Sequence, residues 1–476
     1  MASTREKNFW KSTIILAFGT FLPKLTSFVT LPIYTACLTK SEYGTFDLIT
    51  VLCSLLLPVA TLQIQSAVYR FLLERRFDTD RINSVVTILY LFVIPVSVLV
   101  LGVTYFLLGK AISPYLKFLI VLYFFADILL VVTRQIARGL LKNHVYSTSA
   151  IINSFLNMVL VLVFLLLWDR GLIGLMESLV IATTVSFLYI FIALKIWNYV
   201  NVKQLNWCEF KEIINYSWPM VPNSVSLWVM RVSDRAIISL FLGVEANAIY
   251  AVANKIPTIL QLAQNTFSMA WSESASLTVN DNDVTEYYSK MFRTLHRVMA
   301  GLAALMLACL PILFAILIKG DYDTAYIHIA ILIVGMFFSN IAIYLGGIYV
   351  AYMKTKSIGW TTILAALLNA IINILFIRKI GIFAATLSTT LSYFFLMIYR
   401  LWDIQKFQKI SIDIKETVFT DIVLIIMCII CIKRTMITYI LNCFIGLFLC
   451  YTLNKDLIKK MPLLLLRKLK KDKTKI

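Results

Sequence analysis

Four basic residues stand inside long apolar segments of the sequence, where little water is available to solvate a charge. They are Lys24, Arg231, Arg235 and Lys255. A charge near the middle of a membrane-spanning helix costs at least about 2.5–3.5 kcal/mol, so its presence needs a reason. Arginine holds phosphate oxygens in a planar fork, and lysine acts as a point charge. We therefore expect these four residues to bind an anionic group such as a diphosphate.

Acidic residues at the same depth are fewer, namely Asp127 and Asp234. The surplus of positive charge favours an anionic ligand in a central cavity. The alternative is internal neutralisation, in which Asp234 pairs with a neighbouring arginine at helical spacing and Asp127 pairs with Lys24. Both acids are therefore candidates for ion pairs or for coupling to an ion. Asp47 lies nearer a predicted helix end, where its carboxylate could reach lipid headgroups.

Other constellations point only weakly to chemistry. Asp-x-Asp pairs, which hold a metal and a sugar phosphate in membrane glycosyltransferases, occur at 78–80, 281–283 and 321–323. Only the last falls in a predicted outer loop, which is too small for a catalytic site. The eight cysteines and three histidines show no metal-ligand spacing, and no phosphate-binding G-x-x-x-x-G-K-[ST] loop is present. We expect no catalytic residue, no metal and no cofactor, hence a protein that is not an enzyme.

The composition identifies the environment that these residues need. Of the 476 residues, 60% are hydrophobic and 14% are charged, whereas a soluble domain carries about 25% charged residues. The apolar runs are long enough to cross a hydrocarbon core of about 30 Å as helices. We predict an all-α integral membrane protein with about fourteen transmembrane helices, near residues 12–37, 46–70, 84–108, 114–134, 147–168, 172–196, 214–241, 246–271, 295–318, 325–351, 358–377, 381–401, 416–432 and 436–454.

Lysine and arginine residues in the loops predict the orientation, because they stay on the cytoplasmic side. With both termini inside, 31 of the 44 basic residues fall in inner segments, nine in outer loops and four within helices. Most of the net charge of +19 is therefore a topology signal and does not indicate nucleic acid binding. The basic tail at 467–473 is expected to lie on anionic headgroups.

The sequence also repeats itself. Asn153-Ser-Phe-Leu-Asn157 recurs as Asn369-Ala-Ile-Ile-Asn373, and two prolines recur at the same spacing of 216 residues. Each half has six helices in the same order, and an even number of crossings makes the repeat parallel. We predict an N-terminal lobe over 1–200, a C-terminal lobe over 201–405, and two appended helices with a basic tail over 406–476.

Several segments resemble one known family, the bacterial polysaccharide repeat-unit flippases of the Wzx-like type. Leu31-Pro-Ile-Tyr-Thr-Ala-Cys-Leu-Thr-Lys-Ser-Glu-Tyr-Gly44 is similar to their first interhelical segment, and Ala67-Val-Tyr-Arg-Phe71 follows the second helix. Ala137-Arg-Gly139 is similar to their loop between helices 4 and 5. Ser233-Asp-Arg-Ala-Ile-Ile-Ser-Leu-Phe-Leu-Gly243 and Ile249-Tyr-Ala-Val-Ala-Asn-Lys-Ile-Pro257 match their helix 7 to helix 8 segment.

This resemblance to the multidrug, oligosaccharidyl-lipid and polysaccharide exporter superfamily implies two six-helix lobes, as in exporters of the MATE type. It implies a substrate of undecaprenyl diphosphate carrying a short oligosaccharide, which moves from the inner to the outer leaflet for O-antigen, capsule or exopolysaccharide synthesis. It implies that Lys24, Arg231, Arg235 and Lys255 bind the diphosphate. Membrane lipids, a polysaccharide polymerase and a chain-length regulator are the expected partners, in a multi-pass protein of the cytoplasmic (inner) membrane.

The main alternative is an ion-coupled multidrug exporter of the same fold. Such proteins export cations, so their cavities should carry surplus acid, whereas this sequence carries surplus base. A membrane glycosyltransferase or polymerase should show a large outer loop, and the sequence contains none. The leading hypothesis is therefore a flippase that works by alternating access with a cationic central cavity.

Overall fold

The computed structural model describes residue 23 and residues 26–74, 78–107, 109, 112–218 and 220–473. Within these ranges the secondary structure consists of helices, with no strand. In the described part of the chain, ten helices are long and apolar enough to cross a membrane. The predicted all-α membrane fold is therefore confirmed.

The chain folds into two compact units, Met1–Ala248 and Ile249–Ile476, which are described separately below. The predicted lobes at 1–200 and 201–405 follow the order of helices along the chain, and this division stays a prediction. Residues 26–37 are helical, and the rest of the first unit contains α2 (Lys40–Thr61), α3 (Ile64–Glu74), α4 (Thr79–Leu107), α5 (Pro114–Gly139), α6 (Asn143–Leu162) with a π-helical turn at Val163–Leu167, α7 (Gly171–Leu194), α8 (Trp207–Ser217), α9 (Met220–Leu242) and the start of α10 (Val244–Lys255).

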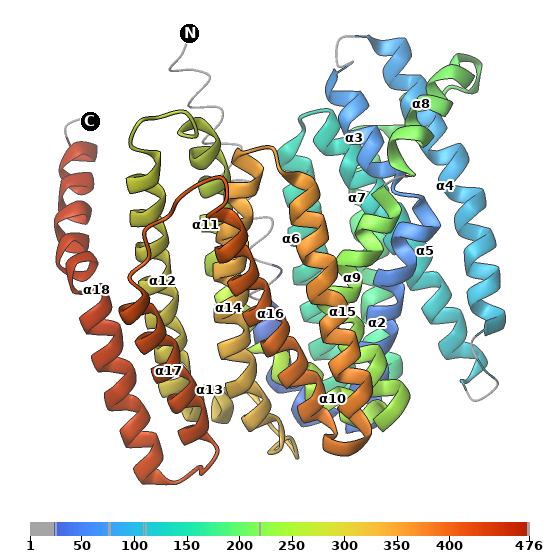
Figure 1. Cartoon of the computed structure of the whole chain (residues 1–476). Coiled ribbons are helices and arrows are strands. Elements are labelled where there is room, and N and C mark those ends of the chain that lie inside the picture. The colour runs from blue at the N-terminus through green and yellow to red at the C-terminus, as the bar shows by residue number, and fades with distance from the viewer. Residues whose placement is uncertain are drawn as a thin grey trace. The chain divides into compact units, whose positions relative to one another are not determined.

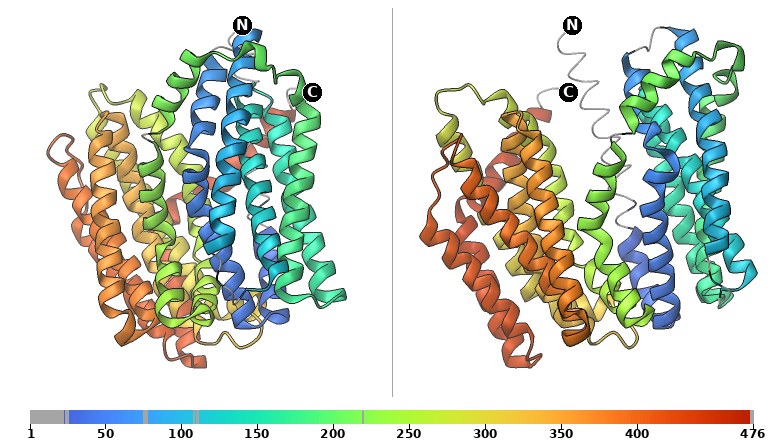
Figure 2. Two further views of the ribbon diagram at one scale, coloured as in Figure 1. Left: turned by 90° about the vertical axis from the view of Figure 1, so that its right-hand side faces the viewer. Right: turned by 45° about the vertical axis from the view of Figure 1, so that its right-hand side comes forward.

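In the first unit, α5 packs against α3 and α7, and α6 packs against α7 (Figure 1). Leu72, Val85, Phe124, Ile136 and Met176 come from four different helices and are almost wholly buried. These side chains form one apolar core between the helices. Figure 2 shows α9 running beside α2, which is also one of the larger helix contacts of this unit.

Several predicted helices are broken in the structure. The second, predicted at 46–70, is α2 and α3, which Leu62 and Gln63 separate in left-handed conformations with φ of 44° and 56°. The seventh, predicted at 214–241, is α8 and α9. The eighth helix, predicted at 246–271, breaks before Thr258, and the ninth, predicted at 295–318, breaks at Cys309. Each break lies near a proline, which cannot donate a helical hydrogen bond.

The second unit contains the remainder of α10 and α11 (Thr258–Leu277), α12 (Val284–Ala308), α13 (Leu310–Leu317), α14 (Ala325–Ala351), α15 (Thr355–Ile380), α16 (Ile382–Ile404), α17 (Ile414–Cys431) and α18 (Met436–Lys473). Helix α14 is mostly buried and packs against α16, α11 and α12. The last transmembrane segment, predicted to end near residue 454, continues as helix through the basic tail.

The internal repeat appears as matching backbone geometry. Leu141, before α6, has a φ of 57°, and Met353, before α15, has a φ of 55°. The next residue donates its N–H to a carbonyl five residues earlier in both places, at 2.8 Å for Lys142 and for Lys354. Lys354 lies 212 residues after Lys142, so the structural register differs by one helical turn from the spacing of 216 seen in the sequence.

Side-chain contacts follow the same register. Asn157 lies at the equivalent position to Asn369, because they are 212 residues apart. The Asn157 side chain accepts a hydrogen bond from Ser178 in the following helix, at 3.2 Å. Asn369 donates to Thr389 in the following helix, at 3.0 Å. The recurring asparagines therefore join the fifth helix to the sixth in each half of the sequence.

Arg400, which the loop count placed in an inner segment, is buried near the end of α16 and is only 4% exposed. Its Nη1 donates to the carbonyl of Ala342 in α14 at 2.7 Å. Its Nε and Nη2 donate to the hydroxyls of Thr361 at 3.2 Å and Thr362 at 3.0 Å in α15. One guanidinium thus joins three helices through neutral acceptors.

Arg400→Ala is expected to lower the free energy of unfolding by about 2 kcal/mol, because one carbonyl and two hydroxyls lose their donors. Thermal unfolding in detergent measures this loss. The exposed Lys379→Ala, at the end of α15, removes a similar charge without a buried contact and should leave the midpoint unchanged. Equal midpoints for both variants would show that Arg400 does not hold these helices together.

Candidate functional site

The beginning of α2 is fixed by hydrogen bonds at its first turn. Thr39 and Glu42 form a capping box, in which the Thr39 hydroxyl accepts from the Glu42 N–H and the Glu42 carboxylate accepts from the Thr39 N–H. The other oxygen of Glu42 accepts from the N–H of Leu172 at 3.2 Å. The first turn of α2 is therefore anchored to the first turn of α7.

Gly44, one turn further on, is the point at which α2 touches α10. A Cβ atom at this position would lie 1.8 Å from the carbonyl oxygen of Val244 and 3.2 Å from the N–H of Ala248. The buried Asn247 donates its side-chain amide to the Gly44 carbonyl at 3.1 Å. Only glycine lets the two helix backbones approach this closely.

Asp47, which lies on the same face of α2 as Gly44, is the centre of a polar cluster. Its Oδ1 accepts from Arg235 Nη1 in α9 at 3.0 Å, and its Oδ2 accepts from Asn247 Nδ2 in α10 at 3.2 Å. The Asp47 side chain is 7% exposed and that of Arg235 is 23% exposed. We call Gly44, Asp47, Arg235 and Asn247 the Asp47 cluster.

A second contact joins the same helices further along α2. The indole N–H of Trp228 in α9 lies 2.9 Å from the Ser54 hydroxyl and 3.2 Å from the Val51 carbonyl, and it donates to both. In the order of the repeat, α9 begins the second half, while α2 is the second helix of the first half. The Asp47 cluster and Trp228 therefore connect helices from different halves of the sequence.

The predicted site residues are placed as follows. Lys24 lies outside the described residues, and so does the side chain of Arg231, although its backbone belongs to α9. Arg235 pairs with Asp47, a partner that the sequence analysis assigned to the headgroup region. Lys255 is half-buried at the last residue of α10. The structure thus places Arg235 in a cluster, and convergence of the four cations stays a prediction.

The two predicted acids lie in different surroundings. Asp127 is half-buried in α5, and Arg134 follows it two turns along the same helix. The guanidinium of Arg134 donates from Nε to the Ser149 hydroxyl and from Nη2 to the Ser149 carbonyl, both at 3.1 Å. Asp234 is 5% exposed in α9. Their roles in ion pairing or coupling stay predictions.

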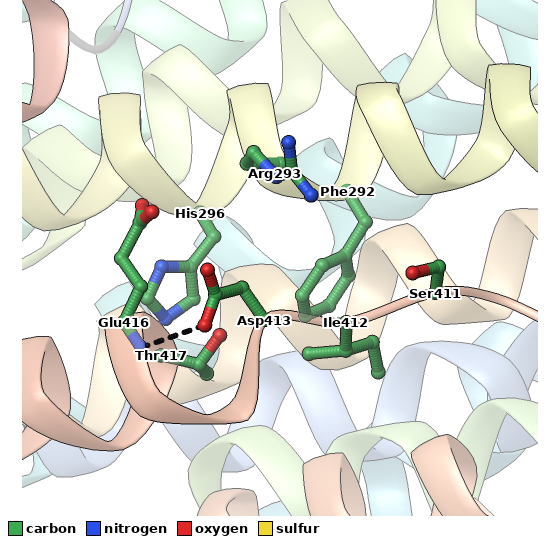
Figure 3. A pocket seen from close by; sticks show the side chains of 8 residues that line it. All are labelled: Phe292, Arg293, His296, Ser411, Ile412, Asp413, Glu416 and Thr417. Carbon is green, nitrogen blue, oxygen red and sulfur yellow. Dashed lines mark hydrogen bonds between the residues drawn. The ribbon is translucent and has the colours of Figure 1, made fainter.

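Helices α12 and α17 of the second unit also bring charged residues together. Arg297 donates from Nε and Nη2 to the two carboxylate oxygens of Glu416, at 2.5 and 2.6 Å. His296 Nε2 lies 3.1 Å from Asp421 Oδ1. Figure 3 shows the small pocket beside them, where Asp413 accepts from the backbone N–H of Glu416 at 3.1 Å.

This pocket has a volume of about 10 Å³, which is about the smallest that can hold one water molecule. The charged pairs around it are therefore contacts that dock α17 onto α12, and not a ligand site. Three or more histidine, cysteine or carboxylate side chains do not gather at any place in the described part of the chain in a way that could hold a metal ion.

Gly44→Ala is expected to lower the free energy of unfolding by about 1–3 kcal/mol, because a new methyl group overlaps the Val244 carbonyl and the two helices must separate. The matched control is Gly102→Ala in α4, where no atom lies within 4 Å of the new Cβ. The control should be neutral or slightly stabilising, because alanine favours a helix by up to about 1 kcal/mol over glycine. Thermal unfolding of both variants measures the difference, and equal midpoints would contradict the close contact.

Comparisons with known proteins agree with this architecture. The family model described as "Polysaccharide biosynthesis protein" matches residues 9–272, more than half of the chain. No curated protein matches the chain.

Solved membrane transporters share the fold. The chain is similar to the structure of "Lipid II flippase MurJ, inward closed conformation", with a TM-score of 0.68 at 15% identity, covering 94% of this chain and 100% of that one. It is also similar to an inward-facing multidrug resistance MATE family transporter of the MOP superfamily, with a TM-score of 0.68 at 12% identity, covering 83% of this chain and 98% of that one. An outward-facing MATE transporter gives a TM-score of 0.58 at 14% identity, with 83% and 94% covered. At these identities the likeness shows the fold alone.

Proposed function

Because the chain belongs to the polysaccharide biosynthesis protein family, we propose that it is a flippase for an undecaprenyl-diphosphate-linked oligosaccharide repeat unit. The substrate moves from the inner to the outer leaflet of the cytoplasmic membrane, where both chain termini face the cytoplasm. The main support for this proposal is the family match over residues 9–272. This range contains the four basic residues that the sequence predicts within membrane spans, namely Lys24, Arg231, Arg235 and Lys255.

Physical chemistry supports this substrate class. An oligosaccharide with a diphosphate cannot cross hydrocarbon unaided, because its hydroxyls and charges would lose their hydration. A wet cavity lined by cations shelters the sugars and neutralises the diphosphate, while the lipid tail stays in the bilayer. Arginine and lysine both form strong charge-assisted hydrogen bonds with phosphate oxygens. The four basic residues supply these donors.

The Asp47 cluster suggests how substrate binding is coupled to opening. Arg235 donates to Asp47 in the structure, so a diphosphate that recruits Arg235 must compete with this carboxylate. Loss of that contact weakens the hold of α2 on α9 and α10. A ligand shifts a conformational equilibrium only by its difference in affinity for the two states. Here the difference is the contact between Arg235 and the diphosphate, which forms only after Asp47 releases the guanidinium.

The second candidate function is export of a cationic drug by an ion-coupled mechanism, which the MATE-like fold favours. A cation carrier needs acidic residues free to bind its substrate. The buried Asp47 is neutralised by Arg235, and the apolar helices carry more basic than acidic residues. This charge balance favours the anionic, lipid-linked substrate.

The proposal is tested by deleting the gene in its own host and following the lipid-linked glycan. The deletion strain should accumulate repeat units on the inner leaflet, lose surface polysaccharide and recover both on complementation. Sensitivity to cationic drugs should not change. Normal glycan export together with drug hypersensitivity would overturn the flippase proposal in favour of the multidrug exporter.

A further inference from the structure

One end of the first unit contains an open pocket of about 360 Å³ that the transport proposal does not use. Its walls come from three places, namely the first turn of α4, the connection between α5 and α6, and the end of α7 with the short helix that follows. All three carry chain segments that the charge pattern assigns to the cytoplasmic side. This volume falls within the range of ligand pockets in proteins, about 300–1,000 Å³.

The charge of the pocket is positive. Lys142 and Lys195 line it, and no carboxylate is among its lining residues. Two acids lie close by in sequence, and both are engaged. Asp78 pairs with Arg81 at 3.2 Å, and Asp80 accepts from Gln204 Nε2 at 2.6 Å. Two lysines therefore line a space in which an anion can lie.

The pocket also offers a hydrogen-bond acceptor. Asn83 lines it, and among the described residues its buried side-chain oxygen has no hydrogen-bond partner. An acceptor left unpaired in a buried place is satisfied when a ligand brings a hydroxyl or ammonium donor. The ligand that fits both features carries a phosphate for the lysines and a donor group for Asn83.

The backbone around the two lysines supports an anion at this place. Lys142 is the N-cap residue of α6 and gives no side-chain cap, so the positive end of the helix dipole is unshielded there. Lys195 ends α7 in the left-handed conformation, with a φ of 53°, where glycine is the usual residue. The backbone does not require a lysine at 195, and this lysine lines the pocket.

The segment next to the pocket indicates the source of that anion. Trp197, Val202 and Trp207 are 50%, 65% and 61% exposed, although they are apolar or amphipathic. The segment is tied to α4, since the Asn201 N–H donates to the Thr87 hydroxyl at 2.8 Å. Tryptophan gathers at the headgroup level of membranes. Such a row of exposed side chains is typical of a segment at the headgroup level, where lipid phosphates lie.

We propose that this pocket binds the phosphodiester headgroup of an anionic membrane lipid from the cytoplasmic leaflet. Lys142 and Lys195 bind the phosphate oxygens, and Asn83 accepts from a hydroxyl of the headgroup, as phosphatidylglycerol would supply. The site is separate from the Asp47 cluster, and the proposal does not depend on the flippase function. It gives the first unit a lipid contact at the end where α4, α6 and α7 meet.

The test uses the purified full chain in a nonionic detergent and dioctanoyl phosphatidylglycerol as the probe. Bound lipid is counted by native mass spectrometry for the wild type and for Lys142→Gln, Lys195→Gly and the double variant. Each single change removes one of the two positive charges and should weaken binding about fivefold, and the double change about 25-fold. Lys195→Gly also suits the left-handed backbone, so this variant is expected to fold normally.

The matched control is Lys203→Gln, which removes an exposed lysine from the same segment outside the pocket and should leave binding unchanged. Two further probes distinguish the source of the phosphate. Dioctanoyl phosphatidylcholine, which has no headgroup donor, should bind more weakly, and inorganic phosphate at millimolar concentration should not displace the anionic lipid. Equal lipid binding by the wild type and the double variant would overturn the site. Displacement by inorganic phosphate alone would overturn the lipid as its ligand.

Discussion

Replacing Lys24 or Arg231 by alanine is expected to reduce glycan export about ten- to a hundredfold while protein levels stay normal. Each change removes one charge-assisted contact with the diphosphate, worth roughly 1.5–3 kcal/mol. Both residues belong to the family-matched region, near the middle of the predicted first and seventh spans. The measurement is the amount of lipid-linked repeat unit that accumulates on the inner leaflet of the complemented deletion strain.

The conservative variant and a surface variant decide how this result is interpreted. Lys24→Arg keeps the positive charge and should retain part of the export. Lys409→Ala removes an exposed lysine from the connection before α17 and should export at the normal rate. If both Lys24→Ala and Arg231→Ala export as the wild type does, these charges do not hold the diphosphate and the cationic-cavity mechanism is wrong.

The existence of the helices could be predicted from the sequence, because an apolar run of sufficient length has few alternatives to a membrane helix. The helix predicted at 325–351 has these bounds in the structure. The interruptions were harder to predict. A proline marks those near Pro257 and Pro311, whereas the break after α2 rests on left-handed conformations of Leu62 and Gln63, which the residue types do not indicate.

The candidate site, too, could be predicted only in part from the sequence. A charge inside an apolar run is visible in the sequence, so Arg235 could be identified as unusual. Its partner could not, because Asp47 lies 188 residues earlier and helix packing alone brings the two together. Arg400 was counted with a loop, since it stands only a few residues before the end of α16, and its burial depends on hydroxyls from α15. Pairings between distant helices require the fold.

Asp47→Asn is expected to release α2 from α9 and α10. The amide has nearly the same size but leaves the partly buried guanidinium of Arg235 without its counter-charge. Breaking a fully buried pair costs about 3–5 kcal/mol, and the 23% exposure of Arg235 reduces this to about 2–3 kcal/mol. The contact should therefore open about 30- to 150-fold more often, since each 1.4 kcal/mol is about tenfold.

A cysteine reporter makes this opening measurable. Ala248 is fully buried in α10 next to Gly44, so Ala248→Cys, in a background without the eight native cysteines, should react slowly with a water-soluble maleimide added to the purified protein. Asp47→Asn should accelerate the reaction by the factor above. Asp281→Asn, the same change at an exposed position, should not.

The exchanged pair Asp47→Arg with Arg235→Asp should restore slow labelling, because the attraction returns with its sign reversed at both ends. Equal labelling rates in all four proteins would mean that the Asp47 cluster does not hold α2 against α9 and α10.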